Sequence, residues 1–412
     1  MINFAYCDVG IPVYHVYKPD SLIVEAQILT KCGSAHEDSD SHGVAHFLEH
    51  LCFQGTPTKD KHQISREMAL IGNYNAYTDY FRTNYHFDTL NEYFEKGFEI
   101  LKESVFDSSY PEYEFEKEKR VIIEEWRMYD NYPSTAHDNF CLEKYFGLQE
   151  GHPIIGTEES IEGMNPEKLH RFRNKWYGKQ NIAVIIVGGV TFEHAMEVVN
   201  KYLPPPKDVQ EVPECLKHYH AASHSFETDR FDQAIYGLVQ PWVNAKQTLE
   251  QNNVPTFMLR ALSTYLYEYI RDDLGLCYGV SQSKMGHYDK SYLFTTILTN
   301  KDNLPKAEAE LFKSYNKIKE EGFPEEIFNI AKRKSIYSLI KGLQGVSGIG
   351  SSLNSLITNS KDPDWILNQG SLFMDEKWLK QKADNLTPKD LQDCAVNNVG
   401  NYVSFSMIPV KK

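Results

Sequence analysis

The chain has 412 residues, of which 41% are hydrophobic and 24% are charged, and its formal net charge is -14. This length and composition are typical of a globular protein of two or three domains with sizeable cores. The acidic balance argues against a nucleic-acid partner, because phosphate binding needs clustered lysine and arginine. The seven cysteines are scattered and form no C-x-x-C pair, so neither a disulfide framework nor a structural zinc knuckle is indicated.

The first residues of the chain carry no recognisable targeting signal. Residues 1–6 lack the basic start and apolar core of an export signal, and they lack the arginine-rich character of a transit peptide. The longest apolar run, residues 182–190, is far too short to span a bilayer. We therefore expect a cytoplasmic, reducing location and no membrane partner.

The first motif that carries chemistry is H-x-x-E-H at residues 46–50. If this segment is helical, His46 and His50 lie one turn apart on the same face, and Glu49 borders that face. Residues 39–41, Ser-Asp-Ser, offer N-cap side chains upstream. Zinc hydrolases need two such nitrogens, a third ligand and a free carboxylate, and H-x-x-E-H is an inverted zincin signature. The alternative is that two histidines and a glutamate share an exposed helix by chance.

A third metal ligand is expected on a charged amphipathic helix over residues 111–130. Pro111 fits the first helical position. Glu118 and Glu125 lie seven residues apart and share one face of this helix, so both carboxylates can point at a metal site. Glu124 stands beside them, and a solvated helix face is the alternative reading for these acids.

A proline-rich segment divides the chain near its middle and is typical of a stiff, solvated linker. Strand-like and helical segments alternate on both sides of it, with long helices expected at 306–321 and 324–343. Two halves of similar order predict a duplicated α+β unit. The expected organisation is a domain at 1–203, a linker at 204–216 and a second domain at 217–412.

Two weaker signals lie in the second half. His218, His220 and His224 alternate along a probable strand, which would suit a second metal site, but no acid or cysteine lies nearby at ligand spacing. We interpret them as surface histidines. The glycine-rich segment 342–350 lacks the Lys-Ser/Thr of a phosphate loop and is interpreted as a flexible connection between helices.

These motifs resemble those of the pitrilysin/insulinase family of zinc peptidases, which includes the mitochondrial processing peptidases. In that family H-x-x-E-H is followed by an E-R-x-V-I-x-E-E segment, and residues 118–125 here read E-K-R-V-I-I-E-E. The last acid of that segment is the family's third ligand, which selects Glu125. The resemblance therefore implies one Zn²⁺ per chain, bound by His46, His50 and Glu125, with Glu118 supporting the site from behind the ligands.

Residues 72–78, G-N-Y-N-A-Y-T, resemble the family's G-x-x-N-A-x-T strand. The resemblance implies an exposed sheet edge on which Asn75 and Ala76 pair with an extended peptide substrate. The alternative is an ordinary amphipathic edge strand. Residues 33–37 and 152–157 also resemble family segments, although no role is assigned to them.

Residues 271–278, R-D-D-L-G-L-C-Y, are similar to the family's R-x-x-x-G-L-x-Y signature. The resemblance implies that Arg271 and Tyr278 face the zinc, stabilise the developing oxyanion and hold the substrate. The alternative is a helix-end arginine and a strand tyrosine with packing roles. The chain departs from commoner members at Leu274 and Cys277, so its substrate preference need not follow theirs.

The resemblance implies an α+β fold of two homologous domains, each a mainly antiparallel sheet packed with helices, forming half of a clamshell. The implied activity is that of a zinc-dependent endopeptidase in which Glu49 is the general base toward the attacking water. Because one chain holds both the zinc motif and the Arg/Tyr pair, we expect a homodimer that encloses short or unfolded peptides, with a heterodimer as the alternative. Two other functions stay open, a dedicated leader-peptide processing peptidase and a non-catalytic scaffold subunit.

Overall fold

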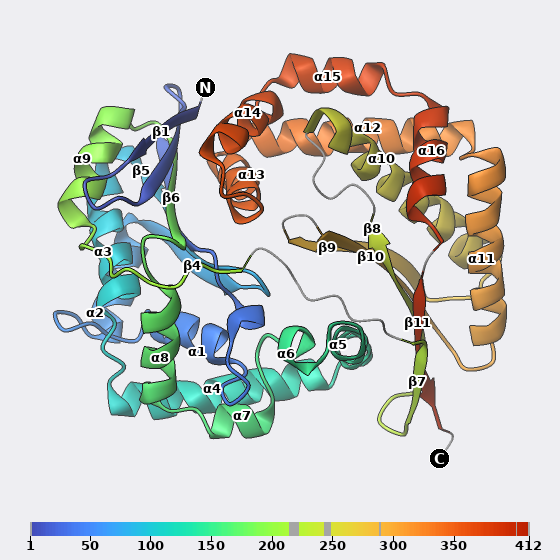
Figure 1. Ribbon diagram of the computed structural model, residues 1–412, viewed down its shortest axis with the longest axis horizontal. Helices are drawn as coiled ribbons and strands as arrows, with labels where there is room; N and C mark the ends of the chain where they lie inside the picture. Colours follow the sequence, from blue (N-terminus) through green and yellow to red (C-terminus); the bar gives the residue numbers. More distant parts are fainter. Residues whose placement is uncertain (1, 214–221, 243–248, 288–289, 401, 411–412) are drawn as a thin grey trace. The chain divides into compact units, whose positions relative to one another are not determined.

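The structure is a computed structural model, and it describes residues 2–213, 222–242, 249–287, 290–400 and 402–410 (Figure 1). The chain forms two compact units, each assembled from segments that are separated in sequence. Within the described residues, the first unit is drawn from Met1–Met128, His152–Pro213 and Gly342–Met374, and the second from Tyr129–Gly151, Glu214–Lys341 and Asp375–Lys412.

A six-stranded sheet organises the first unit. Its strands are β1 (Ile2–Tyr6), β2 (Pro12–Tyr17), β3 (Ile23–Thr30), β4 (Gly72–Thr78), β5 (Thr83–Leu90) and β6 (Ile182–Gly188). They lie in the order β1-β2-β6-β3-β5-β4, and all neighbours are antiparallel except the parallel pair β2 and β6 (Figure 1). Every residue of β6, which reads I-A-V-I-I-V-G, is buried, as expected of a strand covered on both faces.

The second unit contains a five-stranded sheet within the described residues. Its strands are β7 (His224–Thr228), β8 (Ala234–Trp242), β9 (Gly279–His287), β10 (Lys290–Thr299) and β11 (Val403–Pro409), in the order β7-β11-β8-β10-β9. This order repeats β2-β6-β3-β5-β4 strand for strand. In each set the strands that come first and last along the chain, β2 with β6 and β7 with β11, form the one parallel pair. The predicted pair of α+β domains with mainly antiparallel sheets is confirmed.

Helices cover both faces of the first sheet. Val24 and Ala26 of β3 join the main core beneath helices of the first half of the chain, and the alternating Glu25 and Gln27 face α13 (Val346–Thr358). The other helices of this unit are α1 (Val44–Leu51), α2 (Lys61–Ile71), α3 (Phe94–Asp107), α4 (Glu112–Asp130, to Met128), α7 (Glu158–Glu162), α8 (Pro166–Trp176), α9 (Phe192–Tyr202) and α14 (Pro363–Phe373), with short turns η1 (Ser34–His36) and η2 (Asn91–Tyr93).

The helices of the second unit surround the second sheet. The predicted long helices 306–321 and 324–343 appear as α11 (Leu304–Glu321) and α12 (Glu325–Gln344). The glycine-rich segment 342–350, interpreted as a flexible connection, is instead mostly helical, because α12 runs to Gln344 and α13 begins at Val346, which leaves only Gly345 between them. The remaining helices are α5 (Pro133–Phe146), α6 (Leu148–Gly151), α10 (Leu249–Leu266), the π-helical η3 (Tyr267–Asp273), α15 (Glu376–Asp384) and α16 (Pro388–Asn398).

These units differ from the contiguous domains 1–203 and 217–412 expected from the sequence, because a late segment returns to the first sheet. The α13 residue Asn354 donates hydrogen bonds to the Gln27 and Asn84 side chains, both at 2.8 Å. A Cβ atom on Gly350 would lie 2.5 Å from Glu25 Oε2, so a larger residue there would require the Glu25 side chain to shift. Residues 342–374 are therefore part of the first unit.

An early segment passes to the second unit in the same way. His137 of α5 is fully buried, with Nε2 3.2 Å from the Phe405 carbonyl oxygen of β11. A Cβ atom on Gly237 of β8 would lie 2.4 Å from the His137 ring, so the helix packs tightly on this sheet.

The end of the expected linker and both His218 and His220 lie outside the described residues, and His224 is exposed on β7. Among the described helices, none has the length and apolar character needed to cross a membrane.

Candidate metal centre

The H-x-x-E-H motif forms α1, an eight-residue helix with one buried face. Its apolar residues pack into the main core, which leaves the two histidines and Glu49 on the other side. The expected N-cap at residues 39–41 is wrong, because the helix begins after Gly43, which has φ of 90° and no side chain to cap with. The carboxylate of Glu37 takes the place of a cap and accepts hydrogen bonds from the Gly43 and Ala45 amides at 2.7 and 2.8 Å.

Three side chains converge at one point beside α1. His46, His50 and Glu125 each offer a ligand atom, and these atoms lie within 4.8 Å of one another. Glu125 Oε2 is 3.9 Å from His46 Nε2 and 3.5 Å from His50 Nε2. Ligand atoms held about 2 Å from a tetrahedral zinc ion are themselves roughly 3.3–3.5 Å apart, so this donor set fits zinc with little movement.

Charge also favours a dication at this point. The carboxylates of Glu49, Glu118 and Glu125 crowd two imidazoles, and among the described residues their one lysine partner is Lys61, 3.7 Å from Glu118. Burial, with a smaller effect from His50, lowers the pKa of His46 to about 3, which keeps its ring neutral and its lone pair available. Like-charged groups in a partly buried site are costly unless a cation joins them, so the arrangement suits Zn²⁺.

Glu118 lies behind the ligand histidine His50. It is buried on α4, and its Oε1 is 2.9 Å from His50 Nδ1. A carboxylate at this nitrogen keeps the proton on Nδ1 and leaves Nε2 for the metal. Burial opposes the ionised acid, but the hydrogen bond and charge of His50, together with Lys61, lower the pKa of Glu118.

Glu49 stands beside the three ligand atoms without being one of them. Burial raises the pKa of its carboxyl group, and the nearby Glu125 adds to the effect. Its Oε2 accepts a hydrogen bond from Thr78 Oγ1 at 3.1 Å. Sequence reasoning gave Thr78 no role, although it is the last residue of the 72–78 motif and its hydroxyl was the available signal.

The same strand that supplies Thr78 forms the edge of the first sheet. Among the described strands, β4 pairs with β5 alone. Asn75 is exposed, Ala76 is half-buried, and the Ala76 amide donates to Asn75 Oδ1 at 2.9 Å. Ala76 stands two residues before Thr78, about 7 Å along the strand. The side chain of Asn75 therefore holds the Ala76 amide at a point of the edge close to Thr78, which contacts Glu49.

Arg271 and Tyr278 belong to the second unit, so their relation to the metal stays a prediction. The Arg271 Nε donates to the Tyr278 carbonyl oxygen at 3.0 Å, which fixes their spacing. The guanidinium lies 4.6 Å from the ring centroid of Tyr267 and contacts its hydroxyl. Tyr278 is 63% exposed. Sequence reasoning overlooked Tyr267, whose position one turn before Arg271 in η3 was the only signal.

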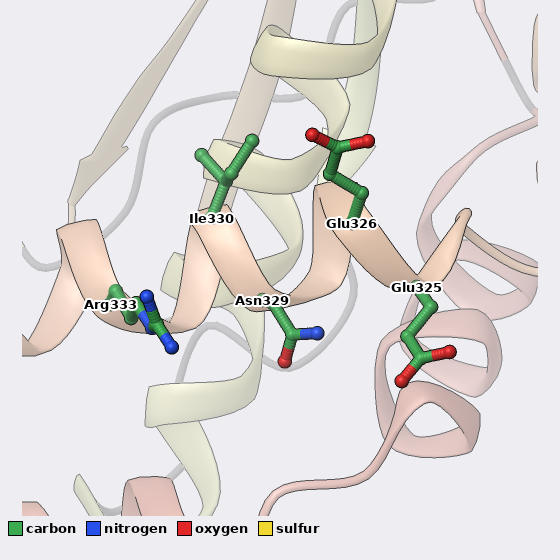
Figure 2. A pocket seen from close by; sticks show the side chains of 5 residues that line it. All are labelled: Glu325, Glu326, Asn329, Ile330 and Arg333. Atoms are coloured by element: carbon green, nitrogen blue, oxygen red, sulfur yellow. The ribbon is translucent and has the colours of Figure 1, made fainter.

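A hollow in the second unit offers less chemistry than this cluster of ligand groups. One of about 560 Å³ lies along α12 in the second unit, and its lining residues are Glu325, Glu326, Asn329, Ile330 and Arg333 (Figure 2). In Figure 2, Glu326 and Ile330 point to one side of the helix and Asn329 and Arg333 to another, so they do not converge on one ligand atom. The only cluster of metal-ligating groups found among the described residues is that of His46, His50 and Glu125.

Two protein-family models match the chain. A family model described as "Insulinase (Peptidase family M16)" matches residues 13–158, which include both zinc-site segments. A second model, "Peptidase M16 inactive domain", matches residues 163–335, which include Arg271 and Tyr278. Together the two models span most of the chain.

Several relatives carry the name zinc protease. An uncharacterized zinc protease of Rickettsia bellii (strain RML369-C) is 28% identical over 309 residues, covering 74% of this chain and 75% of that one. Another, from Bacillus subtilis (strain 168), is 26% identical over 355 residues, covering 84% and 86%. The mitochondrial-processing peptidase subunit beta of Caenorhabditis elegans is 28% identical over 177 residues, covering 42% and 39%.

The fold also has solved counterparts. A protease from Helicobacter pylori superposes with a TM-score of 0.82 at 19% identity, covering 99% of this chain and all of that one. A putative M16-like peptidase from Alicyclobacillus acidocaldarius superposes with a TM-score of 0.76 at 20% identity, covering 100% and 98%. At these identities the likeness shows the fold alone.

Proposed function

Because this chain belongs to the insulinase (M16) family of peptidases, we propose that it is a zinc-dependent endopeptidase acting on short or unfolded peptides. The observation that carries the proposal is the convergence of His46, His50 and Glu125 beside a second carboxylate, that of Glu49, which is not one of the three ligand groups. Relatives named zinc proteases support the same metal and reaction class.

In the proposed reaction, His46, His50 and Glu125 hold the metal. A zinc ion there supplies Lewis-acid chemistry, acidifying water and polarising the scissile carbonyl. Glu49 accepts the proton of the attacking water and later passes a proton to the leaving amine, for which its raised pKa is suited. Thr78 orients Glu49 through its hydroxyl.

Two further parts of the chain are proposed to handle the substrate. The β4 edge at Asn75 and Ala76 aligns an extended peptide by adding it to the sheet. Arg271 and Tyr278 donate to the developing oxyanion or hold the peptide backbone. A guanidinium fixed by a backbone carbonyl and an aromatic ring suits this task, since preorganised donors need no reorganisation during reaction.

The test of this proposal is cleavage of a peptide mixture before and after chelation, followed by restoration with zinc. Loss of cleavage on chelation and its recovery with about one zinc per chain would support it. A protein that cleaves equally well without metal would contradict it. A scaffold without activity is disfavoured, because every ligand of the site and the adjacent base are present together.

The same experiment addresses the alternative of a dedicated leader-peptide peptidase. Cleavage of many unrelated peptides favours a general peptidase, whereas cleavage of one sequence among many favours maturation of a precursor.

We further propose that the active species is a homodimer, because one chain holds both the metal ligands and the Arg271 and Tyr278 pair. Sedimentation of the active protein as a monomer would overturn this part.

A further inference from the structure

The start of the zinc helix cannot cap itself. Helix α1 begins at Val44, and its N-cap residue Gly43 has φ of 90°, which favours glycine. A Cβ atom there would lie 2.5 Å from the Ile155 carbonyl oxygen, so a serine or asparagine does not fit. The first-turn amides of so short a helix need acceptors from elsewhere, because no residue of the helix can supply them.

Glu37 supplies those acceptors from outside the helix. Its two carboxylate oxygens accept hydrogen bonds from the Gly43 amide at 2.7 Å and the Ala45 amide at 2.8 Å. The carboxylate is fully buried, and His152 Nε2 lies 2.7 Å from Oε2. A negative charge at a helix N-terminus is stabilised by the helix dipole, and the imidazole partner offsets the cost of burying it.

His152 in turn belongs to a loop that packs directly on the residues before α1. Its ring stacks on that of His42, with centroids 3.9 Å apart and planes at 8°. Within this loop, a Cβ atom on Gly156 would lie 2.7 Å from the His42 carbonyl oxygen. Glu37 and His152 therefore join three separate segments at the first turn of α1.

The contacts of Glu37 and His152 affect the placement of His46 more than that of His50. His50 is held from behind by Glu118, whereas His46 Nδ1 is buried and has no hydrogen-bond partner among the described residues. The orientation of His46 therefore depends on its backbone, and the amide of the preceding residue, Ala45, is one that Glu37 holds. A small movement of the first turn would carry His46 away from His50 and Glu125.

We propose that Glu37 and His152 are positioning residues that fix the first turn of α1 and thereby the placement of His46 at the metal. The inference rests on the proposed zinc site and adds two residues to it. Neither residue touches the metal or the substrate. Their effect reaches the site through the α1 backbone.

The test compares Glu37→Gln with a matched capping variant far from the site. Thr191→Ala removes the side chain that caps α9, where Thr191 Oγ1 accepts from the His194 amide at 3.3 Å. Three quantities are measured: zinc affinity by competition with a chelator, the absorption spectrum of the Co²⁺-substituted protein, and hydrogen exchange of residues 44–51 in metal-free protein. None of these readouts requires turnover.

Glu37→Gln replaces one acceptor oxygen by an amide nitrogen, which donates and cannot accept a hydrogen bond from the helix. We expect its zinc affinity to fall about 10-fold or more, as for other groups behind metal ligands, with an altered Co²⁺ spectrum and faster exchange in the first turn. Thr191→Ala should match wild type in all three. Wild-type zinc affinity, spectrum and exchange in Glu37→Gln would overturn the inference.

A second pair keeps the test decisive if Glu37→Gln does not fold. His152→Gln retains a donor toward Glu37, and His152→Leu removes it, so only the leucine variant should weaken zinc binding. Equal zinc affinity in both variants and wild type would overturn the inference. Failure of the proposed zinc site is distinguishable from failure of this inference. If the zinc site is wrong, wild type binds no zinc, but hydrogen exchange in the metal-free protein still reports whether Glu37 holds the first turn of α1.

Discussion

The Oε1 atom of Glu118 lies 2.9 Å from Nδ1 of His50, while Nε2 of the same ring is 3.5 Å from Glu125. One imidazole thus bridges a buried acid and the metal position. This contact holds the orientation of the ring and favours a proton on Nδ1, which would leave Nε2 for a metal.

Glu118→Gln should weaken zinc binding by about 10- to 100-fold, or about 1.4 to 2.7 kcal/mol, because the amide holds His50 without a charge. Competition with a chelator measures this affinity. Glu124→Gln is the matched control, since Glu124 lies on the same helix but is exposed and pairs with Arg127 at 2.7 Å. Equal losses in both variants would show that Glu118 has no particular role.

Thr78→Val should lower kcat by about tenfold while leaving zinc content unchanged, because only the hydroxyl that orients Glu49 is lost. Thr78→Ser keeps a hydroxyl and should retain most of the activity. Steady-state kinetics and metal analysis on the same samples separate the two effects. A valine variant with wild-type kcat would contradict the role of Thr78.

Arg271→Lys and Tyr278→Phe should each lower kcat/KM by about 10- to 100-fold without changing zinc affinity, because both residues are proposed to act on the substrate. Lysine cannot reproduce both the bond to the Tyr278 carbonyl and the stacking on Tyr267. Kinetics with one peptide substrate and a chelator titration check this. Unchanged kcat/KM would assign the pair a purely structural role.

Glu103 of α3 contacts residues 56–59, which follow α1, and its contribution to the free energy of unfolding should depend on pH. Burial opposes its ionisation, but contacts from Lys59, Thr56 and Thr58 lower the pKa of Glu103 to about 2. A folded-state pKa below the ordinary value means that the contribution is complete above about pH 5 and is lost as the pH falls toward 2. Glu103→Gln should therefore destabilise the protein by about 1 to 2 kcal/mol at pH 6, after allowance for solvent screening, and by less at pH 3.

Urea unfolding of wild type and Glu103→Gln at the two pH values measures this difference. A free-energy difference that stays constant between pH 6 and pH 3 would mean that Glu103 is not held by charge. Thr58→Ala, which removes one neutral contact to the same carboxylate, should destabilise by a smaller amount at pH 6.

Part of the candidate metal site can be predicted from sequence because helical spacing is a local property, whereas the choice of Glu125 as third ligand came from the family resemblance. His46 and His50 are four residues apart on α1, and Glu118 and Glu125 are seven apart on α4, so each pair shares a face in any helix. The alternation of strand-like and helical segments likewise predicts an α+β fold in each half, although it does not give the order of the strands within a sheet. These inferences need no knowledge of distant contacts.

Contacts between distant segments lie beyond such reasoning. The true cap of α1 is Glu37, which reaches the helix through the fold, while the nearer Ser-Asp-Ser at 39–41 matches the local rule better. The return of α13 to the first sheet depends on Asn354 meeting Gln27 and Asn84, and nothing in the local pattern of any of the three indicates that meeting. Tertiary hydrogen bonds of buried polar groups decided both outcomes.

The most direct test of the central claim is zinc content and peptide turnover measured in parallel on wild type and Glu49→Gln. The glutamine variant keeps His46, His50 and Glu125 but has no carboxylate to accept a proton. We predict about one zinc per chain in both proteins and turnover in wild type alone. Full turnover by Glu49→Gln, or wild type that holds no zinc after reconstitution, would contradict the account.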